Sequence, residues 1–221
     1  MTDQHPGIFV TLEGIEGVGK TSSLRYLAEY LHQHDIPLLI TREPGGTPLA
    51  DDIRHFLLSE HKEQIEPETE LLLMFAARAQ HINTVIRPAL ASGKLVLCDR
   101  FTDTSYAYQG AGRGIAFERI KVLENLVQDG LKPDLTILLD APAEVGRARI
   151  QDRKKADRFE MESNKFFTKA RRAYLKMAQD EPGRFRVIDA SQAQEEVHKQ
   201  LLAVLQPYLA KLKQAQAFEL S

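Results

Sequence analysis

The segment Gly14–Thr21, with the sequence GIEGVGKT, fits the pattern G-x-x-x-x-G-K-[ST] at every fixed position. Its glycines let the backbone curl so that successive N–H groups point into one concavity, which suits a phosphate. Lys20 adds a positive charge that can reach the β- and γ-phosphates of a nucleotide, and Thr21 offers a hydroxyl to Mg²⁺. The segment therefore predicts a phosphate-binding loop, or P-loop, made of Gly14, Ile15, Glu16, Gly17, Val18, Gly19, Lys20 and Thr21.

The residues on either side of the P-loop have the patterns of a strand and a helix. Ile8–Leu12 is apolar and rich in β-branched residues, as a buried parallel strand is. From Thr21 to Gln33, apolar residues recur at helical spacing. A phosphate in the loop would then also meet a helix N-terminus. A chance match in a glycine-containing turn would not have this context.

The composition is that of a single folded domain. The chain has 221 residues, of which 43% are hydrophobic, and this is enough for one α/β domain with a sizeable core. No internal repeat or domain-sized linker is visible, so residues 1–221 are predicted to form one domain. The formal net charge is −2 and no long basic run occurs, which argues against non-specific binding to nucleic acid.

Three features favour a cytoplasmic protein that does not enter a membrane. The segment Met1–Gly7 is polar and lacks the apolar core of a signal peptide. The longest apolar stretch, Leu71–Ala77, is much too short to span a bilayer. Cys98 is the single cysteine, so no disulfide can form within the chain, and its apolar neighbours predict a buried, inert thiol.

Five short apolar runs predict strands, and helical patterns separate them. This alternation implies right-handed crossovers and a mostly parallel sheet with helices on both faces. The strands are expected at Ile8–Leu12, Pro37–Thr41, Leu95–Cys98, Leu135–Leu139 and Arg186–Ile188. Further helices are expected at Pro48–Leu58 with Thr47 as N-cap, from Pro67 past Arg78 toward Ala91 with a kink or early end at Pro88, and at Phe117–Gln128, Ala143–Ile150, Glu162–Gln179 and Gln194–Gln214.

The segment Gln151–Arg158 is polar apart from Ala156 and contains Arg153, Lys154 and Lys155 as well as Arg158. It has no apolar stripe at helical spacing. Beside a nucleotide site, it is interpreted as a lid over the phosphates, near residues 150–160. A solvated surface loop is the alternative interpretation, since basic loops are usually that.

Polar residues follow the predicted strands at their carboxyl ends, where parallel sheets bind ligands. Arg42–Thr47, Asp99–Phe101 and Asp140 are in such positions. Asp99 can act on Mg²⁺ directly or through its waters, and Arg100 can hold a phosphate with two hydrogen bonds. The alternative is a surface Asp–Arg pair.

Other polar residues are candidates for the acceptor side of the site. Arg54, in a predicted helix, can turn toward the same acceptor or lie in solvent. Arg78 is an odd charge on an apolar helix face, where it either reaches the surface or points into a pocket. Tyr108 and Gln109 combine an aromatic wall with an amide, which can contact the edge of a base. Glu43 opens the rigid turn Glu43–Gly46.

Several classes of P-loop protein lack support in the sequence. A switch GTPase would carry N-K-x-D, but the one Asn-Lys pair, Asn164-Lys165, is followed by two phenylalanines inside a predicted helix. No predicted strand is followed by D-x-x-G. A mechanochemical ATPase is usually larger. A kinase with a small anionic acceptor fits the second set of polar groups better.

With these motifs in this order, the chain resembles the thymidylate kinase family, in its bacterial form, over almost its whole length. The P-loop alone is common to many families, whereas the other motifs are more specific. The matching stretches are Phe9–Thr21, Thr41–Thr47, Asp99–Phe101, Ser105–Arg113, Leu138–Asp140 and Asp157–Glu160. The resemblance implies a nucleoside monophosphate kinase fold, with a five-stranded parallel sheet in the order 2-3-1-4-5, and a homodimer.

The activity implied by the resemblance is transfer of the γ-phosphoryl group of ATP to dTMP, which forms dTDP. The P-loop and Lys20 would hold the ATP phosphates, and Thr21 and Asp99 would organise Mg²⁺. Arg153, helped by Arg149, would close over the transferring group. The catalytic residues implied are Lys20, Asp99, Arg100 and Arg153.

The resemblance also implies the residues that bind dTMP. Arg54 and Arg100 would clamp its phosphate, Glu16 would meet the 3′-hydroxyl, and Tyr108 would fill the space that a ribose 2′-hydroxyl needs. Arg78 would bind the thymine, with Ser105 and Gln109 near its edge. Glu43 is a further dTMP-binding candidate.

One position departs from the family pattern, which usually has a phenylalanine four residues before the thymine-binding arginine. Here Met74 has that spacing, and Phe75 is three residues before Arg78. Either Met74 packs on the base through its polarisable sulfur, or Phe75 does so after a small rotation of the helix.

Two alternative functions stay open at this stage. A deoxynucleoside kinase would phosphorylate the 5′-hydroxyl itself and would not need Arg54 and Arg100 around a monophosphate. A nucleotide-dependent binding module would use ATP to change conformation for a protein partner.

Overall fold

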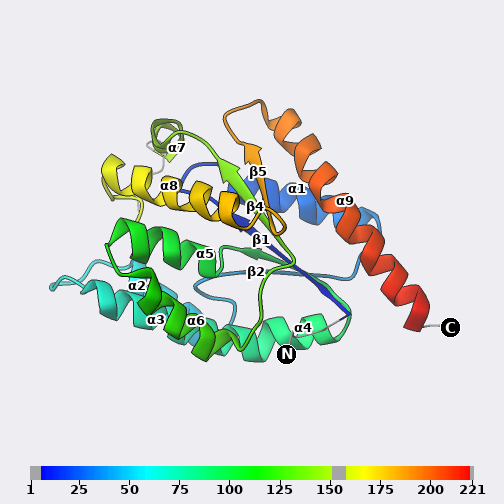
Figure 1. Ribbon diagram of the computed structural model, residues 1–221, viewed down its shortest axis with the longest axis horizontal. Coiled ribbons are helices and arrows are strands. Elements are labelled where there is room, and N and C mark those ends of the chain that lie inside the picture. Colours follow the sequence, from blue (N-terminus) through cyan, green and yellow to red (C-terminus); the bar gives the residue numbers. More distant parts are fainter. Residues whose placement is uncertain (1–5, 151–157, 220–221) are drawn as a thin grey trace.

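A five-stranded parallel sheet forms the centre of the computed structural model, which describes residues 6–150 and 158–219 (Figure 1). The strand order is β2-β3-β1-β4-β5, as predicted. The predicted strands are all present, and each boundary lies within one residue of its expected place. They are β1 (Ile8–Glu13), β2 (Leu38–Arg42), β3 (Leu95–Asp99), β4 (Leu135–Asp140) and β5 (Phe185–Asp189).

Helical segments connect the strands and cover both faces of the sheet. They are α1 (Lys20–Gln33), α2 (Pro48–Leu58), α3 (Pro67–His81), η1 (Ile82–Ile86), α4 (Arg87–Ala91), α5 (Thr102–Ser105), η2 (Tyr106–Gly112), α6 (Phe117–Gln128), α7 (Ala143–Ile150), α8 (Asn164–Asp180) and α9 (Gln194–Glu219). Of these, η1 and η2 are π-helical. In the described part of the chain, no helix has both the length and the hydropathy needed to cross a bilayer.

Neighbouring residues of each strand pack on opposite faces of the sheet. Val10 and Leu97 belong to the main core cluster, which also contains apolar residues of α1 and α9. Phe9, Val96 and Cys98 belong to a second cluster with η1 and α4. Figure 1 shows α1 and α9 on one side of the sheet and α4 on the other. The alternation explains why these strands are apolar throughout.

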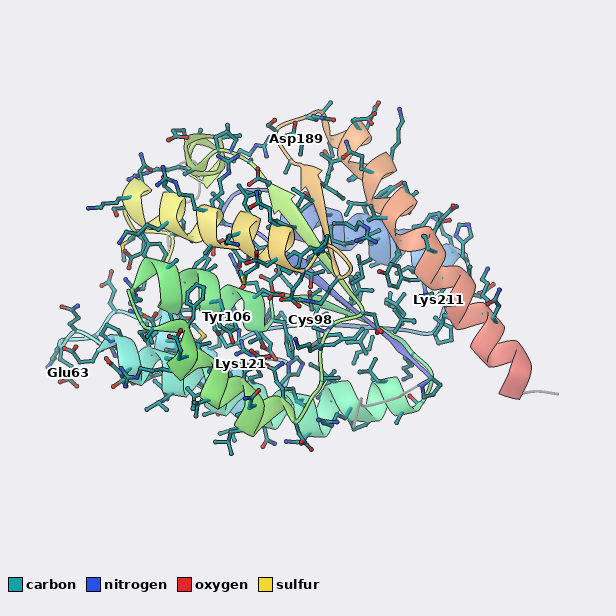
Figure 2. All side chains as sticks on the ribbon, viewed as in Figure 1. Glu63, Cys98, Tyr106, Lys121, Asp189 and Lys211 are labelled. Carbon is teal, nitrogen blue, oxygen red and sulfur yellow. The ribbon has the colours of Figure 1, made fainter. Side chains whose placement is uncertain are left out.

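Cys98 is completely buried in this second cluster, and Figure 2 places it in the interior of the molecule. Burial raises the pKa of its thiol well above the ordinary value, and the nearby carboxylates of Glu43 and Asp99 add to the effect. The thiol is therefore a packing group, as its apolar neighbours in the sequence predicted.

The second helix begins as expected. Thr47 has an extended backbone, and its hydroxyl accepts a hydrogen bond from the N–H of Ala50 at 3.1 Å. Pro48 occupies the first helical position, where its missing N–H costs nothing. This cap fixes the direction in which α2 leaves the turn after β2.

The long helix predicted from Pro67 toward Ala91 differs from the expectation. It is α-helical only to His81, and η1 follows before Pro88. Within this stretch the N–H of Arg87 bonds to the carbonyl of Ile82, five residues earlier. Pro88 has no N–H to donate to the preceding turn. The wider π turn directly before Pro88 lets the chain continue as a helix without that bond.

The segment Thr102–Gly112 is helical, which the sequence analysis did not anticipate. Threonine and serine are weak helix formers, and the segment ends in glycines. Its side chains are nevertheless mostly buried, because it packs against α8. Tertiary contacts therefore decide this conformation, and it carries several of the predicted site residues.

Candidate active site

The P-loop connects β1 to α1 and has the conformation that its glycines allow. Gly17 has a φ of +75°, and a Cβ on it would lie 2.0 Å from the carbonyl oxygen of Gly146, so α7 approaches the loop too closely for any side chain. Gly19, the N-cap of α1, supplies no side-chain hydrogen bond. The first N–H groups of α1 therefore have no side-chain cap and can bind a phosphate.

Lys20, the first residue of α1, bridges the loop. Its Nζ donates hydrogen bonds to the carbonyl oxygens of Gly14 at 3.1 Å and Ile15 at 2.9 Å. Burial lowers the pKa of Lys20, and the charge of Arg100 lowers it further, although Glu16 acts in the opposite direction. Burial removes water from this ammonium group, and a phosphate beside it would compensate for the lost hydration.

A cavity of about 480 Å³ lies beside the P-loop, at the carboxyl ends of β2 and β3. It contains six cationic side chains and four acidic ones, a combination suited to anions that arrive with a metal ion or hydroxyl groups. The lining residues are Glu16, Gly17, Gly19, Lys20, Thr21, Ser22, Arg25, Arg42, Glu43, Arg54, Asp99, Arg100, Arg149 and Glu160. Most of the predicted phosphate-binding and catalytic residues thus meet in one place.

Arg100 directly follows β3 and contacts the P-loop. Its Nη2 is 2.6 Å from a carboxylate oxygen of Glu16 and 3.0 Å from the hydroxyl of Tyr108, and its Nη1 donates to the carbonyl of Gly14 at 3.0 Å. Burial alone would lower the pKa of Arg100, but Glu16, the two nearby tyrosines Tyr108 and Tyr174, and Asp99 raise it well above the ordinary value. The group is a fixed cation, so the alternative of a surface Asp–Arg pair is not the arrangement found.

Arg54 reaches the same cavity from α2. Its Nη1 donates to the carbonyl of Pro44 at 3.0 Å, in the turn that follows β2. The turn therefore holds this guanidinium group beside the cavity that Arg100 also lines.

Arg78 is almost completely buried behind the cavity, with an exposed fraction of 3%. Its Nε donates to Glu43 at 2.6 Å, its Nη1 to Ser105 at 3.1 Å and its Nη2 to the carbonyl of Phe101 at 3.2 Å. His81 contacts the other oxygen of Glu43 at 3.0 Å. The structure thus brings Glu43, Arg78 and Ser105 together, and Glu43 is the member that lines the cavity.

Gln109 is fully buried on η2, one turn after Ser105. Its Nε2 donates to Glu70 of α3 at 2.9 Å, while its Oε1 has no hydrogen-bond partner in the described part of the chain. Gln109 and Ser105 therefore both contact side chains of α3.

Met74 and Phe75 point in different directions from α3. Phe75 packs in a cluster with Leu71, Ile115 and Ile120, and its ring lies 4.5 Å from the guanidinium carbon of Arg78. Met74 belongs to the main core cluster, together with Tyr108. The two side chains therefore pack in different clusters.

Arg158 is the last residue of the segment Gln151–Arg158, which was interpreted as a lid over the phosphates, but its contacts lie elsewhere. Its Nη2 lies 2.5 Å from Glu70, and its Nε donates to the carbonyl of Leu57 at 2.9 Å. Arg113 binds the same carboxylate of Glu70. Arg158 therefore joins α2 and α3 instead of facing the P-loop. Arg153 and the other residues of 151–157 lie outside the described residues.

Asp140 also has a structural role, as its contacts show. Arg171 of α8 binds both of its carboxylate oxygens, at 2.7 and 2.8 Å, and Asp140 does not line the cavity. Its position at the end of β4 was correctly predicted, but its carboxylate forms an ion pair with Arg171 of α8.

Asp99 is the residue best suited to a cation. Its Oδ1 is buried and accepts no hydrogen bond from the described residues, and the exposed Thr21 lines the same cavity. Within residues 6–150 and 158–219, no group of three or more histidine, cysteine, aspartate or glutamate side chains is arranged to hold a metal ion. An ion here would therefore take most of its ligands from phosphates and water.

Four lining residues were not assigned a role from the sequence: Ser22, Arg25, Arg42 and Glu160. Arg42 and Glu160 lie within motifs that were recognised, T-R-E-P-G-G-T and D-R-F-E. Their position in those motifs could have indicated that they lie at the site. Arg25 is on the first helix, one turn after Thr21, and only the helical spacing could have indicated it.

The sheet order, the P-loop and the cationic cavity at the strand ends together define a P-loop kinase of the nucleoside monophosphate kinase type. Comparison with known proteins narrows this class. The thymidylate kinase family model matches residues 12–201, and the chain belongs to that family.

Individual relatives agree with this assignment. The chain is 54% identical to the thymidylate kinase of Pseudomonas putida strain GB-1 over 199 residues, which are 90% of this chain and 95% of the relative. It is 55% identical to that of Pseudomonas fluorescens strain Pf0-1 over 206 residues, 93% of this chain and 98% of the relative. The crystal structure of thymidylate kinase from Ehrlichia chaffeensis superposes with a TM-score of 0.73 at 34% identity, covering 90% of this chain and 98% of that one.

Proposed function

We propose that the cavity beside the P-loop holds the two substrates of the thymidylate kinase reaction end to end. In this reaction the γ-phosphoryl group of ATP is transferred to dTMP, which forms dTDP. The observation that carries the proposal is that Lys20, Arg54 and Arg100 line one cavity of about 480 Å³ together with residues of the P-loop. We place the reaction in the cytoplasm, where ATP is available.

ATP would bind with its phosphates on the P-loop amides and Lys20. A neighbouring cavity of about 290 Å³ shares Gly19, Ser22 and Arg149 with the first one. It extends toward Ala190 and His198, past the end of β5, which supports a place for the nucleoside of ATP. Arg149, whose Nη1 donates to the carbonyl of Ala190 at 3.1 Å, would line the path between the two cavities.

The acceptor dTMP would bind with its phosphate between Arg54 and Arg100. Glu16, held by Arg100, would meet the deoxyribose 3′-hydroxyl. Tyr108, whose ring lies under the guanidinium group of Arg100 at 4.8 Å, would leave no space for a 2′-hydroxyl. Glu43 would complete this part of the site by fixing Arg78.

The thymine would lie between α3 and η2, which supply complementary groups. Arg78 and Ser105 are donors to the base oxygens, and the Oε1 of Gln109, which has no partner in the described structure, is an acceptor for the base N–H. Met74, which belongs to the same core cluster as Tyr108, would pack on the ring. Phe75 is occupied by its cluster with α6.

Thr21 and Asp99 would hold Mg²⁺, because Asp99 presents a buried carboxylate oxygen with no other partner among the described residues. When bound, the ion neutralises phosphate charge. Lys20 and Arg100 would place the two phosphates in line, and the removal of water strengthens their attraction to the transferring group. Arg153, from the segment outside the described residues, is proposed to supply a further positive charge.

A coupled assay of ADP release tests this function. With ATP and Mg²⁺, we expect turnover with dTMP, and only background rates with thymidine or without an acceptor. Turnover with thymidine would indicate a deoxynucleoside kinase, because that enzyme phosphorylates a 5′-hydroxyl. Equal ADP release in all three reactions would indicate a nucleotide-driven switch and would contradict the proposal.

A homodimer is the second part of the proposal. Adjacent helices α3 and α6 (Figure 1) carry exposed apolar side chains, including Leu72, Val122 and Leu126 with exposed fractions of 55%, 66% and 75%. Burial of this face against a second copy would remove it from water.

Sedimentation velocity tests the dimer. We expect a mass twice that of one chain, and a shift toward monomer in Leu126→Glu, because a charge in an apolar interface costs free energy. The control is Val187→Glu, which changes an exposed apolar residue on edge strand β5. A wild-type protein that stays monomeric at micromolar concentration would refute this part.

A further inference from the structure

Glu13, the last residue of β1, is a completely buried carboxylate with a defined set of partners. One oxygen accepts a hydrogen bond from the backbone N–H of Phe101 at 2.7 Å. The other accepts from the hydroxyls of Thr104 at 2.6 Å and Tyr174 at 2.8 Å. Glu13 does not line the cavity, and the roles proposed so far do not use it. A buried charge of this kind is costly to keep.

These partners surround Arg100. The backbone of Arg100 has a φ of +68°, a left-handed conformation that is unfavourable for a residue other than glycine. Its N–H bonds to the carbonyl of Leu12 at 2.9 Å, and the next N–H, that of Phe101, bonds to Glu13. Two adjacent residues of β1 therefore hold the main chain on both sides of Arg100.

The side chain of Arg100 is held through the same carboxylate. Its Nη1 lies 3.3 Å from the hydroxyl oxygen of Thr104 and 3.4 Å from that of Tyr174. Each hydroxyl has one hydrogen. The two hydroxyl oxygens are also 2.7 Å apart, so the hydrogen of one can point to the other hydroxyl or to Glu13. Because an ionised Glu13 only accepts, both hydrogens are used within this group of oxygens, and both hydroxyl oxygens present lone pairs to the guanidinium group.

We propose that Glu13 is a positioning residue for the phosphate acceptor, because its carboxylate fixes both the backbone and the guanidinium group of Arg100. The inference rests on the proposed role of Arg100 at the phosphate of dTMP. A glutamine at this position has the same shape but cannot accept from Phe101, Thr104 and Tyr174 together. Its amide would donate to a hydroxyl, and that hydroxyl would then turn its hydrogen toward Arg100.

The test compares wild type, Glu13→Gln, Arg100→Ala and the double variant by steady-state kinetics at pH 8. Burial and the charge of Asp103 raise the pKa of Glu13 to about 7, so at pH 8 an ionised carboxylate is compared with a neutral amide. For Glu13→Gln we expect kcat/KM for dTMP to fall about 10- to 100-fold. We expect the KM for ATP to stay within about twofold, since Lys20 keeps its own contacts with Gly14 and Ile15.

The double variant shows whether Glu13 acts through Arg100. If it does, adding Glu13→Gln to Arg100→Ala causes little further loss with dTMP. If the loss of kcat/KM in the double variant equals the product of the two single losses, the proposal is overturned. A Glu13→Gln protein with a lower melting temperature but normal kinetics with dTMP would also overturn it. If Arg100→Ala itself leaves dTMP use intact, the proposed role of Arg100 fails and the inference falls with it.

Two further variants keep the test decisive. Glu124→Gln changes a mostly buried carboxylate of α6 that binds Tyr106 and Lys121 outside the cavity, and it should leave dTMP kinetics unchanged. Tyr174→Phe keeps the ring and removes one of the two hydroxyls that lie between Glu13 and Arg100. It should therefore raise the KM for dTMP, an effect in the same direction as that of Glu13→Gln but smaller. If Glu13→Gln does not fold, a Tyr174→Phe protein with unchanged KM values overturns the proposal.

Discussion

Lys20→Met is expected to lower kcat about 10²- to 10³-fold, the range found when one preorganised donor to a developing charge is removed. Methionine keeps the length and apolar stem of the lysine but has no charge. The KM for dTMP should change little, because Lys20 contacts the P-loop carbonyls, whereas the phosphate of dTMP is proposed to lie between Arg54 and Arg100. Initial rates at saturating ATP and dTMP measure the effect.

The fold should survive this substitution. Removal of Nζ leaves the carbonyls of Gly14 and Ile15 without that donor, a cost of about 1–3 kcal/mol, but it also removes a buried charge. Lys132→Met is the control, because Lys132 is about half exposed and does not line the cavity. Turnover of Lys20→Met close to that of wild type would contradict the assignment of the P-loop lysine.

The elements that position the P-loop could be predicted because their signals are local. The apolar run before Gly14, the glycine spacing of the loop and the helical spacing after Thr21 each describe a few consecutive residues. The five strands were found in the same way. The order of the strands came from the family resemblance, since no local pattern states which strands are neighbours.

The part of the site that is proposed to bind the base was harder to predict from the sequence. Thr102–Gly112 has a composition unfavourable for a helix, and its packing against α8 decides its conformation. Asp140 was noted for its place at the end of a strand and Arg158 as part of the predicted lid, yet Arg171 pairs with Asp140 and Glu70 pairs with Arg158. These partners are distant in the sequence, and only the folded chain brings them together.

Arg78→Met is expected to affect both stability and the choice of substrate. Arg78 and Glu43 are 2.6 Å apart, with exposed side-chain fractions of 3% and 2%. Breaking a buried pair leaves an uncompensated charge and costs about 3–5 kcal/mol of unfolding free energy. His81 would be the remaining partner of Glu43. Chemical denaturation followed by circular dichroism measures this loss.

A matched control separates burial from pairing. Arg119 and Glu68 are 2.8 Å apart but have exposed fractions of 60% and 51%, so Arg119→Met should change the unfolding free energy by less than about 1 kcal/mol. Adding Glu43→Gln to Arg78→Met should recover part of the stability, because the unpaired carboxylate is then gone. A loss as small as that of Arg119→Met would show that Glu43 is well solvated or paired without Arg78.

The same variant tests the base-binding side of the cavity. If Arg78 donates to thymine, the KM for dTMP should rise at least about 10-fold, the loss expected for a charged hydrogen bond. The KM for ATP should stay near that of wild type, because the P-loop is not in contact with Arg78 in the described structure. Both constants are measured at a temperature where the variant is fully folded. Equal weakening of ATP and dTMP would remove Arg78 from the base pocket and leave it a structural ion pair that holds the turn after β2 against α3.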